Sequence, residues 1–181
     1  MKEVFVFLAN GFEETEAVAT IDILRRGDLN VTTVSISNDL LVTGAHDISV
    51  KADTIFENTD FSNGSMLVLP GGMPGASNLN AHEGLKKVLS SYFESGKNVA
   101  AICAAPLVLG GLGILKGKKA TCYPSFEPQL IGAEITGNPA EKDGTVITGK
   151  GPGYVIDFAL ALVAELQGKA KADEVAAGFL P

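Results

Sequence analysis

Short apolar runs alternate along this chain with longer segments in which apolar residues recur every three or four positions. Residues 4–9 form the first apolar run, and residues 13–26 follow with Ala17, Ile21 and Leu24 on one helical face. The first pattern is typical of a buried strand and the second of an amphipathic helix. Short apolar strands that alternate with helices predict a mostly parallel sheet with helices on both faces.

The same pattern continues to the C-terminal end. Further strands are predicted at residues 31–36, 66–69, 99–102, 120–123, 134–136 and 146–148, and a short irregular or β segment at 40–51. Further helices are predicted at residues 83–94, from Leu107 onward, at 154–167 and near 172–177. The chain has 21 glycines in 181 residues, which fits many tight turns. With no repeat or linker in the sequence, residues 1–181 are expected to form one domain.

Charge and hydropathy exclude several classes of partner. The net charge is −7 and the charged residues are scattered, which argues against nucleic acid as a partner. No apolar run reaches the roughly 18 residues that a membrane span needs, and the run at 4–9 is too short for a signal peptide. The two cysteines have no metal-ligand spacing, so we expect no metal site and a reducing, cytoplasmic location.

Cys103 lies where the strand pattern at 99–102 stops and a helix pattern begins. Unpaired backbone N–H groups at a helix N-terminus stabilise an anion, so the pKa of this thiol is expected to be lowered. Hydrolases expose a nucleophile on the same kind of sharp strand-to-helix turn. The alternative is a buried structural cysteine, because free cysteine is among the most buried residue types.

Three carboxylates begin the first helix. Glu13 and Glu14 fit the simple role of complementing the helix dipole. Glu16 comes directly before the apolar pair Ala17 and Val18, and if its side chain turns inward it meets the ends of the strands, where Cys103 is expected. Beside Cys103 it would share a single proton with the thiol and act as a general acid and base.

A glycine-rich bend, residues 70–75, follows the strand at 66–69. The N–H groups of this bend, with that of Ala104, could form an anion nest or oxyanion hole, although a plain tight turn is an equal alternative. Residues 144–150 have the spacing of a phosphate-binding loop, but Gly151 replaces its Ser or Thr and no nucleotide cofactor is expected. His82 is expected to be solvated and His46 to lie away from any site.

Five of these segments together resemble the DJ-1/ThiJ/PfpI superfamily, and its DJ-1 branch in particular. They are residues 11–16 (Gly-Phe-Glu-Glu-Thr-Glu), 69–72 (Leu-Pro-Gly-Gly), 101–106 (Ala-Ile-Cys-Ala-Ala-Pro), 120–124 (Ala-Thr-Cys-Tyr-Pro) and 151–153 (Gly-Pro-Gly). The resemblance implies a flavodoxin-like three-layer sandwich, usually a homodimer, that needs no cofactor.

The resemblance also assigns expected roles to single residues. Cys103 becomes an oxidation-prone nucleophile and Glu16 its carboxylate partner. Oxyanion or substrate contacts fall to four residues, Gly71, Gly72, Ala104 and Tyr123. Asp22 and Arg26 fall where the family often places an acid and a base of the dimer interface.

Two departures limit what the resemblance implies. The DJ-1 branch often has His where this chain has Tyr123, so a Cys–His dyad at that point is impossible. The protease-like branch has His directly after its cysteine, where this chain has Ala104. Cys122 is expected to be a core residue, with a resolving thiol for an oxidised Cys103 as the alternative.

Three functions remain open from the sequence. The first is a cofactor-independent glyoxalase or deglycase activity on small α-oxoaldehydes such as methylglyoxal, with Cys103 as nucleophile and Glu16 as acid and base. The second is a non-catalytic oxidant sensor or chaperone that depends on oxidation of Cys103. The third, ranked last, is hydrolysis of small amides or peptides.

Overall fold

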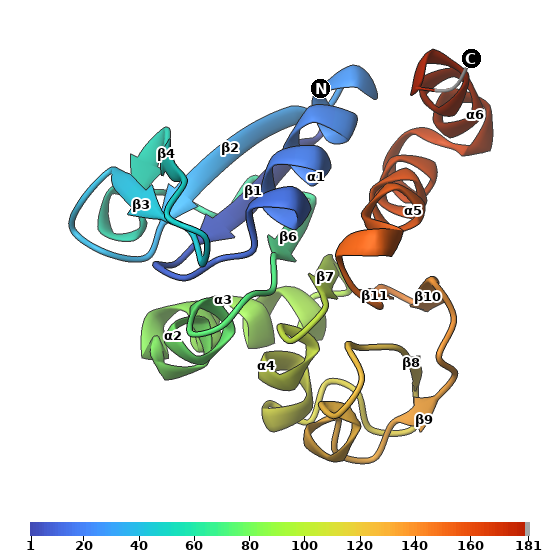
Figure 1. Cartoon of the computed structure of the whole chain (residues 1–181). Coiled ribbons are helices and arrows are strands. Elements are labelled where there is room, and N and C mark those ends of the chain that lie inside the picture. The colour runs from blue at the N-terminus through green and yellow to red at the C-terminus, as the bar shows by residue number, and fades with distance from the viewer. Residues whose placement is uncertain (180–181) are drawn as a thin grey trace.

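A seven-stranded sheet forms the centre of the computed structural model, which describes residues 1–179 (Figure 1). The strand order is β10-β11-β7-β6-β1-β2-β5, and every neighbouring pair is parallel except β10 with β11. The strands are β1 (Glu3–Leu8), β2 (Asn30–Ser35), β5 (Thr54–Ile55), β6 (Met66–Leu69), β7 (Asn98–Ile102), β10 (Ala140–Asp143) and β11 (Val146–Gly149). The predicted mostly parallel α/β architecture is confirmed.

Helices cover both faces of this sheet. In Figure 1, α1 (Glu14–Arg26), α5 (Val155–Gln167) and α6 (Lys169–Phe179) lie on one side of it. The other side is covered by α2 (Gly75–Ala81), α3 (Glu83–Glu94) and α4 (Pro106–Gly111). Strands buried on both faces must be apolar along their whole length, and β6 and the last four residues of β7 are entirely buried.

Two small sheets lie outside the central one. β3 (Leu41–Thr43) and β4 (Ser49–Lys51) form an antiparallel hairpin, which matches the β alternative predicted for residues 40–51. β8 (Lys119–Ala120) pairs in parallel with β9 (Glu134–Ile135). The strand predicted at 120–123 is therefore wrong beyond Ala120, because Thr121 donates its N–H to a side chain, Oγ1 of Thr148, instead of a strand.

The ligand-binding edge of the sheet follows from its strand order. β1 is followed along the chain by β2 on one side of it, whereas β6 and β7 lie on the other side. In open parallel sheets, the crevice at such a reversal, beyond the carboxyl ends of the strands, is where ligands bind. The turns after β1, β6, β7 and β11 meet at this edge, and they carry the residues singled out in the sequence.

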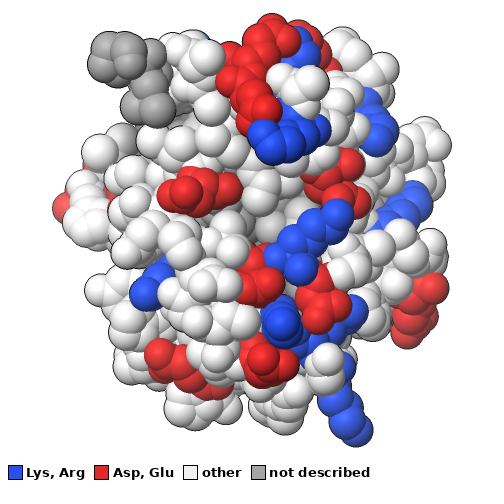
Figure 2. Space-filling view, turned by 90° about the vertical axis from the view of Figure 1, so that its right-hand side faces the viewer, with Lys and Arg blue, Asp and Glu red and all other residues white. Residues whose placement is uncertain are grey.

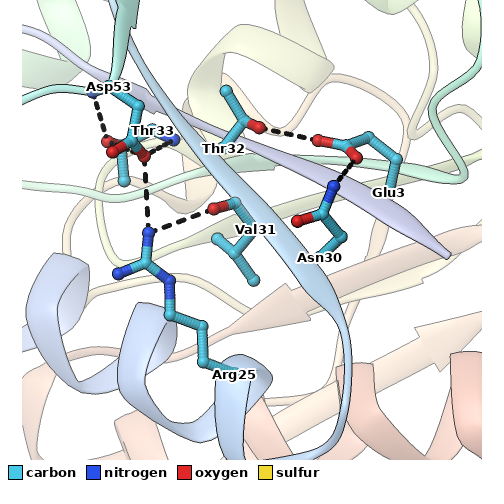
Figure 3. A network of polar contacts seen from close by, with 7 residues as sticks. All are labelled: Glu3, Arg25, Asn30, Val31, Thr32, Thr33 and Asp53. Atoms are coloured by element: carbon cyan, nitrogen blue, oxygen red, sulfur yellow. Dashed lines mark hydrogen bonds and ion pairs between the residues drawn. The ribbon is translucent and has the colours of Figure 1, made fainter. Parts of the chain in front are cut away.

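A network of polar side chains surrounds β2 (Figure 3). Oδ2 of Asp53 accepts hydrogen bonds from the backbone N–H and the hydroxyl of Thr33, at 2.8 and 2.7 Å. The same oxygen forms an ion pair with Arg25 at 3.3 Å. Nearby, Glu3 accepts hydrogen bonds from the side chains of Thr32 and Asn30. The network ties α1 and the segment before β5 to the central sheet.

Surface charges are mixed. Figure 2 shows the side of the molecule that carries α5 and α6, where basic side chains alternate with acidic ones. α6 itself holds ion pairs between neighbouring turns, Lys169–Asp173 at 2.6 Å and Lys171–Glu174 at 2.8 Å. Across residues 1–179, no helix combines the length and apolar character that crossing a membrane would require.

Candidate active site

Cys103 occupies a sharp turn directly after β7. Its φ is 66°, in the left-handed region that residues with a Cβ atom avoid, which costs about 1–3 kcal/mol. Its N–H donates to the carbonyl of Gly149 at 2.9 Å, and its carbonyl accepts from the N–H of Tyr123 at 2.9 Å. These two bonds hold the strained turn between the segment that follows β8 and the last residue of β11. The thiol side chain is almost completely buried, with 8% of the residue exposed.

Glu16 lies in the same crevice. It is in the first turn of α1 and is fully buried, so its side chain turns inward. Oε2 accepts a 2.9 Å hydrogen bond from the N–H of Gly71, whereas Oε1 has no partner at hydrogen-bond geometry. The carboxyl nevertheless lies close enough to the thiol of Cys103 for each group to change the pKa of the other.

Both groups hold their protons more tightly than they would in water. Burial raises the pKa of Glu16 to about 7, although contacts with Cys103 and the N–H of Gly71 oppose the rise. Burial, followed by the charge of Glu16, raises the pKa of Cys103 to about 12. The lowered thiol pKa expected from the helix terminus is therefore wrong for a cysteine that faces an ionised Glu16. The first proton leaves the pair near pH 7 and the second far above it, so one proton is shared in between.

The backbone N–H groups around the pair have separate roles. Those of Gly72 and Ala104 face the sulfur and lower the pKa of Cys103. The N–H of Gly71 donates to Glu16, so this residue holds the carboxyl, and the oxyanion or substrate contact expected from it stays a prediction. A Cβ atom at position 71 would lie 2.6 Å from Cβ of Cys103 and 2.7 Å from Oε2 of Glu16. Only glycine fits between them.

Tyr123 and Cys122 lie in the segment that runs beside the nucleophile. Tyr123 contacts Cys103 through its backbone N–H, and 46% of the residue is exposed. Its side chain lines a pocket with residues 150–154, so the structure places it beside the site. Cys122 is buried, as predicted for a core residue, and burial raises its pKa to about 11.

The sequence analysis missed the role of His46. Its backbone N–H and Nδ1 contact the two oxygens of Glu14, at 2.6 and 2.8 Å. This contact raises the pKa of His46, and it fastens the loop after β3 to the first turn of the helix that carries Glu16. The sequence alone carries no signal for this contact, because the pairing depends on the burial of Glu14 and on a hairpin whose position the sequence does not specify.

Donor atoms of Glu13, Glu14 and His46 lie within 4.8 Å of one another, close enough to hold a metal ion. However, Glu14 is already engaged by His46, and Oε2 of Glu13 caps the helix by accepting the N–H of Glu16 at 2.7 Å. The cluster therefore serves the local structure. His82, expected to be solvated, is half-buried instead, and its Nδ1 accepts the N–H of Leu85 as the cap of α3.

Asp22 and Arg26 bind each other. Oδ2 of Asp22 accepts from Nε of Arg26 at 2.9 Å, one turn apart on α1, and both side chains are about half exposed. The pair lies on the outer face of the helix, away from the strand-end crevice. The expected dimer contact remains a prediction.

Comparisons with known proteins agree with this geometry. The model of the DJ-1/PfpI family matches residues 2–165. Protein DJ-1 homolog B of Arabidopsis thaliana is 42% identical over 96% of this chain. The matched part makes up only 40% of that relative's length. A second relative is Deglycase PH1704 of Pyrococcus horikoshii, 32% identical over 84% of the chain and 91% of the relative.

Among solved structures, oxidised DJ-1 of Toxoplasma gondii superposes with a TM-score of 0.95 at 34% identity, over 99% of this chain and 98% of that one. Sequence and fold thus lead to the same group of proteins. The flavodoxin-like sandwich, the strained cysteine turn after β7 and the buried glutamate of α1 occur here in a chain that belongs to the DJ-1/PfpI family.

Proposed function

We propose that this protein is a cofactor-independent glyoxalase- or deglycase-type enzyme that acts on small α-oxoaldehydes such as methylglyoxal. One observation carries the proposal: a buried carboxyl with one oxygen free of partners lies against a cysteine on a strained turn. Such a pair can supply both a nucleophile and a group that moves protons near neutral pH. The relative named as a deglycase gives further support.

The reaction starts from the form of the pair in which Glu16 holds the shared proton. The thiolate of Cys103 attacks the aldehyde carbon and forms a C–S bond, and the aldehyde oxygen takes a proton from Glu16. The N–H of Ala104 lies beside the sulfur and can stabilise the developing oxyanion.

Glu16, now a carboxylate, then removes the hydrogen of the former aldehyde carbon and returns it to the neighbouring ketone carbon, while the proton of the new hydroxyl passes to the ketone oxygen. The first carbon becomes a thioester and the second an alcohol, so oxidation and reduction balance within the substrate. Water hydrolyses the thioester, which releases the hydroxy acid and the thiol. Glu16 can make both transfers because its pKa lies near 7.

Lactate formation from methylglyoxal tests this proposal directly. Both Cys103→Ser and Glu16→Gln should reduce the rate by at least about 100-fold, since each removes a group that the chemistry needs. Cys122→Ser is the matched control and should retain the rate, because Cys122 takes no part in the reaction. Absence of lactate from the wild-type protein, or an active Glu16→Gln variant, would overturn the assignment.

The second candidate is an oxidant sensor in which Cys103 is converted to the sulfinate. The Toxoplasma gondii relative has been solved in an oxidised state, and the N–H groups of Gly72 and Ala104 could hold an anion at this sulfur. A sensor would form no lactate yet would gain two oxygen atoms at Cys103 under mild peroxide. Peptide mass spectrometry separates this outcome from catalysis.

We also propose a homodimer that uses the outer face of α1. Val18 on this face is 49% exposed, and Asp22 and Arg26 follow it at helical spacing. A half-exposed valine beside an ion pair fits a contact with a second copy. Sedimentation of the wild type and of Val18→Asp should give a dimer and a monomer, respectively; a monomeric wild type contradicts the proposal.

A further inference from the structure

An aromatic-walled pocket of about 250 Å³ adjoins the candidate active site. Two segments form it, one after β8 and one after β11. Its lining consists of Tyr123, Pro124, Lys150, Gly151, Pro152, Gly153 and Tyr154. Apart from the amine of Lys150 and the two phenol hydroxyls, these side chains offer an incoming group only apolar surface.

Cys103 is joined by its own backbone to both walls of this pocket. Its carbonyl accepts the N–H of Tyr123, the first residue of one wall. Its N–H donates to the carbonyl of Gly149, the residue directly before the other wall. Both walls of the pocket therefore lie beside the backbone of Cys103.

Two tyrosine rings make the pocket aromatic. Tyr123 is 46% exposed and Tyr154 is 41% exposed, although large aromatic side chains are usually covered. A Cβ atom at position 151 would lie 3.1 Å from the ring of Tyr123, so the glycine leaves this ring room to lie along the wall. Lys150 has its amine 5.5 Å from the centre of the Tyr154 ring, and it donates to the carbonyl of Gly137 at 3.1 Å. The cation is thus held at the rim.

We propose that this pocket is a subsite for an aryl group, or an apolar group of similar size, on the carbonyl substrate of Cys103. The inference rests on the proposed function and adds the substrate class: aryl-substituted α-oxoaldehydes in preference to methylglyoxal. The volume is sufficient, because an apolar cavity of roughly 150 Å³ already holds benzene. Ring-to-ring contacts with Tyr123 and Tyr154 would favour an aryl group over a methyl group.

Alkylation of Cys103 tests the subsite without any turnover. The probes are 2-bromoacetophenone and bromoacetone, which differ only in a phenyl or methyl group on the carbonyl. In each case the thiolate attacks the CH₂ carbon, a C–S bond forms and bromide leaves. The ratio of the two rates at Cys103, divided by the same ratio for glutathione, reports the preference for the aryl group. Rates are read by peptide mass spectrometry.

The wild-type ratio should exceed that of glutathione by about five- to tenfold, the effect expected of one good aromatic contact. Tyr154→Ala should bring the ratio back to within about twofold of glutathione, and Tyr154→Phe should keep it, because the ring is retained. Ile156→Ala is the matched control, since Ile156 is an exposed apolar residue of α5 outside the pocket lining. It should leave the ratio unchanged.

The subsite is overturned by a wild-type ratio equal to that of glutathione, by a ratio that Tyr154→Ala does not change, or by no reaction at Cys103. The first of these results is also expected if a second copy of the chain fills the pocket. Lactate formation is measured separately. A raised aryl ratio without lactate would refute the proposed turnover and keep the subsite. Lactate formation without an aryl preference would refute the subsite and keep the proposed turnover.

Discussion

The backbone N–H of Gly71 donates a 2.9 Å hydrogen bond to Oε2 of Glu16 and so holds this fully buried carboxyl in place. Oε1 is left without a hydrogen-bond partner beside Cys103. A buried polar atom without a partner is costly, and such atoms are kept mainly where chemistry uses them. The free oxygen is therefore the part of the site that can take up or give the shared proton.

The pH dependence of alkylation should reveal this shared proton. In the wild type, the rate at Cys103 should rise with a midpoint near pH 7, where the pair loses its first proton. In Glu16→Gln the midpoint should move upward, because an amide donates a weaker hydrogen bond to the thiolate than a carboxylic acid does. Iodoacetamide rates between pH 5 and 10, read by peptide mass, provide the measurement.

Cys122 is the internal control for that experiment. It is buried with a pKa raised to about 11, so it should react slowly throughout the range in the folded protein. An identical midpoint for wild type and Glu16→Gln would mean that Glu16 does not share the proton.

Stability should fall with rising pH because of Glu16. Its pKa is 4.5 when exposed and is raised to about 7 in the folded protein. The folded state therefore binds the proton more tightly, and this contribution is complete below pH 4.5 and lost as the pH rises through 7. Such a shift corresponds to about 3 kcal/mol of unfolding free energy. Urea unfolding at pH 4.5 and 7.5 should show this loss in the wild type and little of it in Glu16→Gln; equal pH dependence would contradict the assignment.

Gly71→Ala should disturb both the fold and the site. The added Cβ atom would lie within 2.7 Å of side-chain atoms of Cys103 and Glu16. Overpacking of this kind costs about 1–3 kcal/mol. We expect a lower thermal midpoint and slower alkylation of Cys103. Gly178→Ala in α6 is the control, because a Cβ atom there meets nothing within 4 Å and helix propensity favours alanine.

Asp53 should contribute more to stability than Arg25, its ion-pair partner. Asp53→Ala removes the acceptor for two groups of Thr33, a residue that is 4% exposed, and should cost about 1–2 kcal/mol. Arg25→Ala mainly removes an ion pair whose side chains are both about half exposed, which is worth about 0–1 kcal/mol. Figure 3 shows these contacts. Chemical denaturation of the two variants gives the loss of unfolding free energy for each. A larger loss for Arg25→Ala would contradict the ranking.

Local patterns were sufficient to predict most of the sheet and its helices. β6 and β7 are apolar along almost their whole length, and α1 begins after Glu13 and ends before Gly27, so each element could be recognised from neighbouring residues alone. The elements that were missed are the short ones. β5 has two residues, β10 contains three charged residues, and α2 is a glycine- and asparagine-containing helix; none of these has a strong local signal.

The sequence by itself determined which residues could do chemistry here: one cysteine at a strand end, one glutamate before an apolar pair, and a glycine-rich bend. Their types and positions along the chain depend only on local order. The tertiary structure decided how they interact, because the strand order brings the turns after β1, β6 and β7 to one edge. At this edge the N–H of Gly71 donates a hydrogen bond to Glu16, and burial and charge raise the pKa of Cys103. Desolvation and Coulomb interaction depend on distances in space, which separation along the chain does not specify.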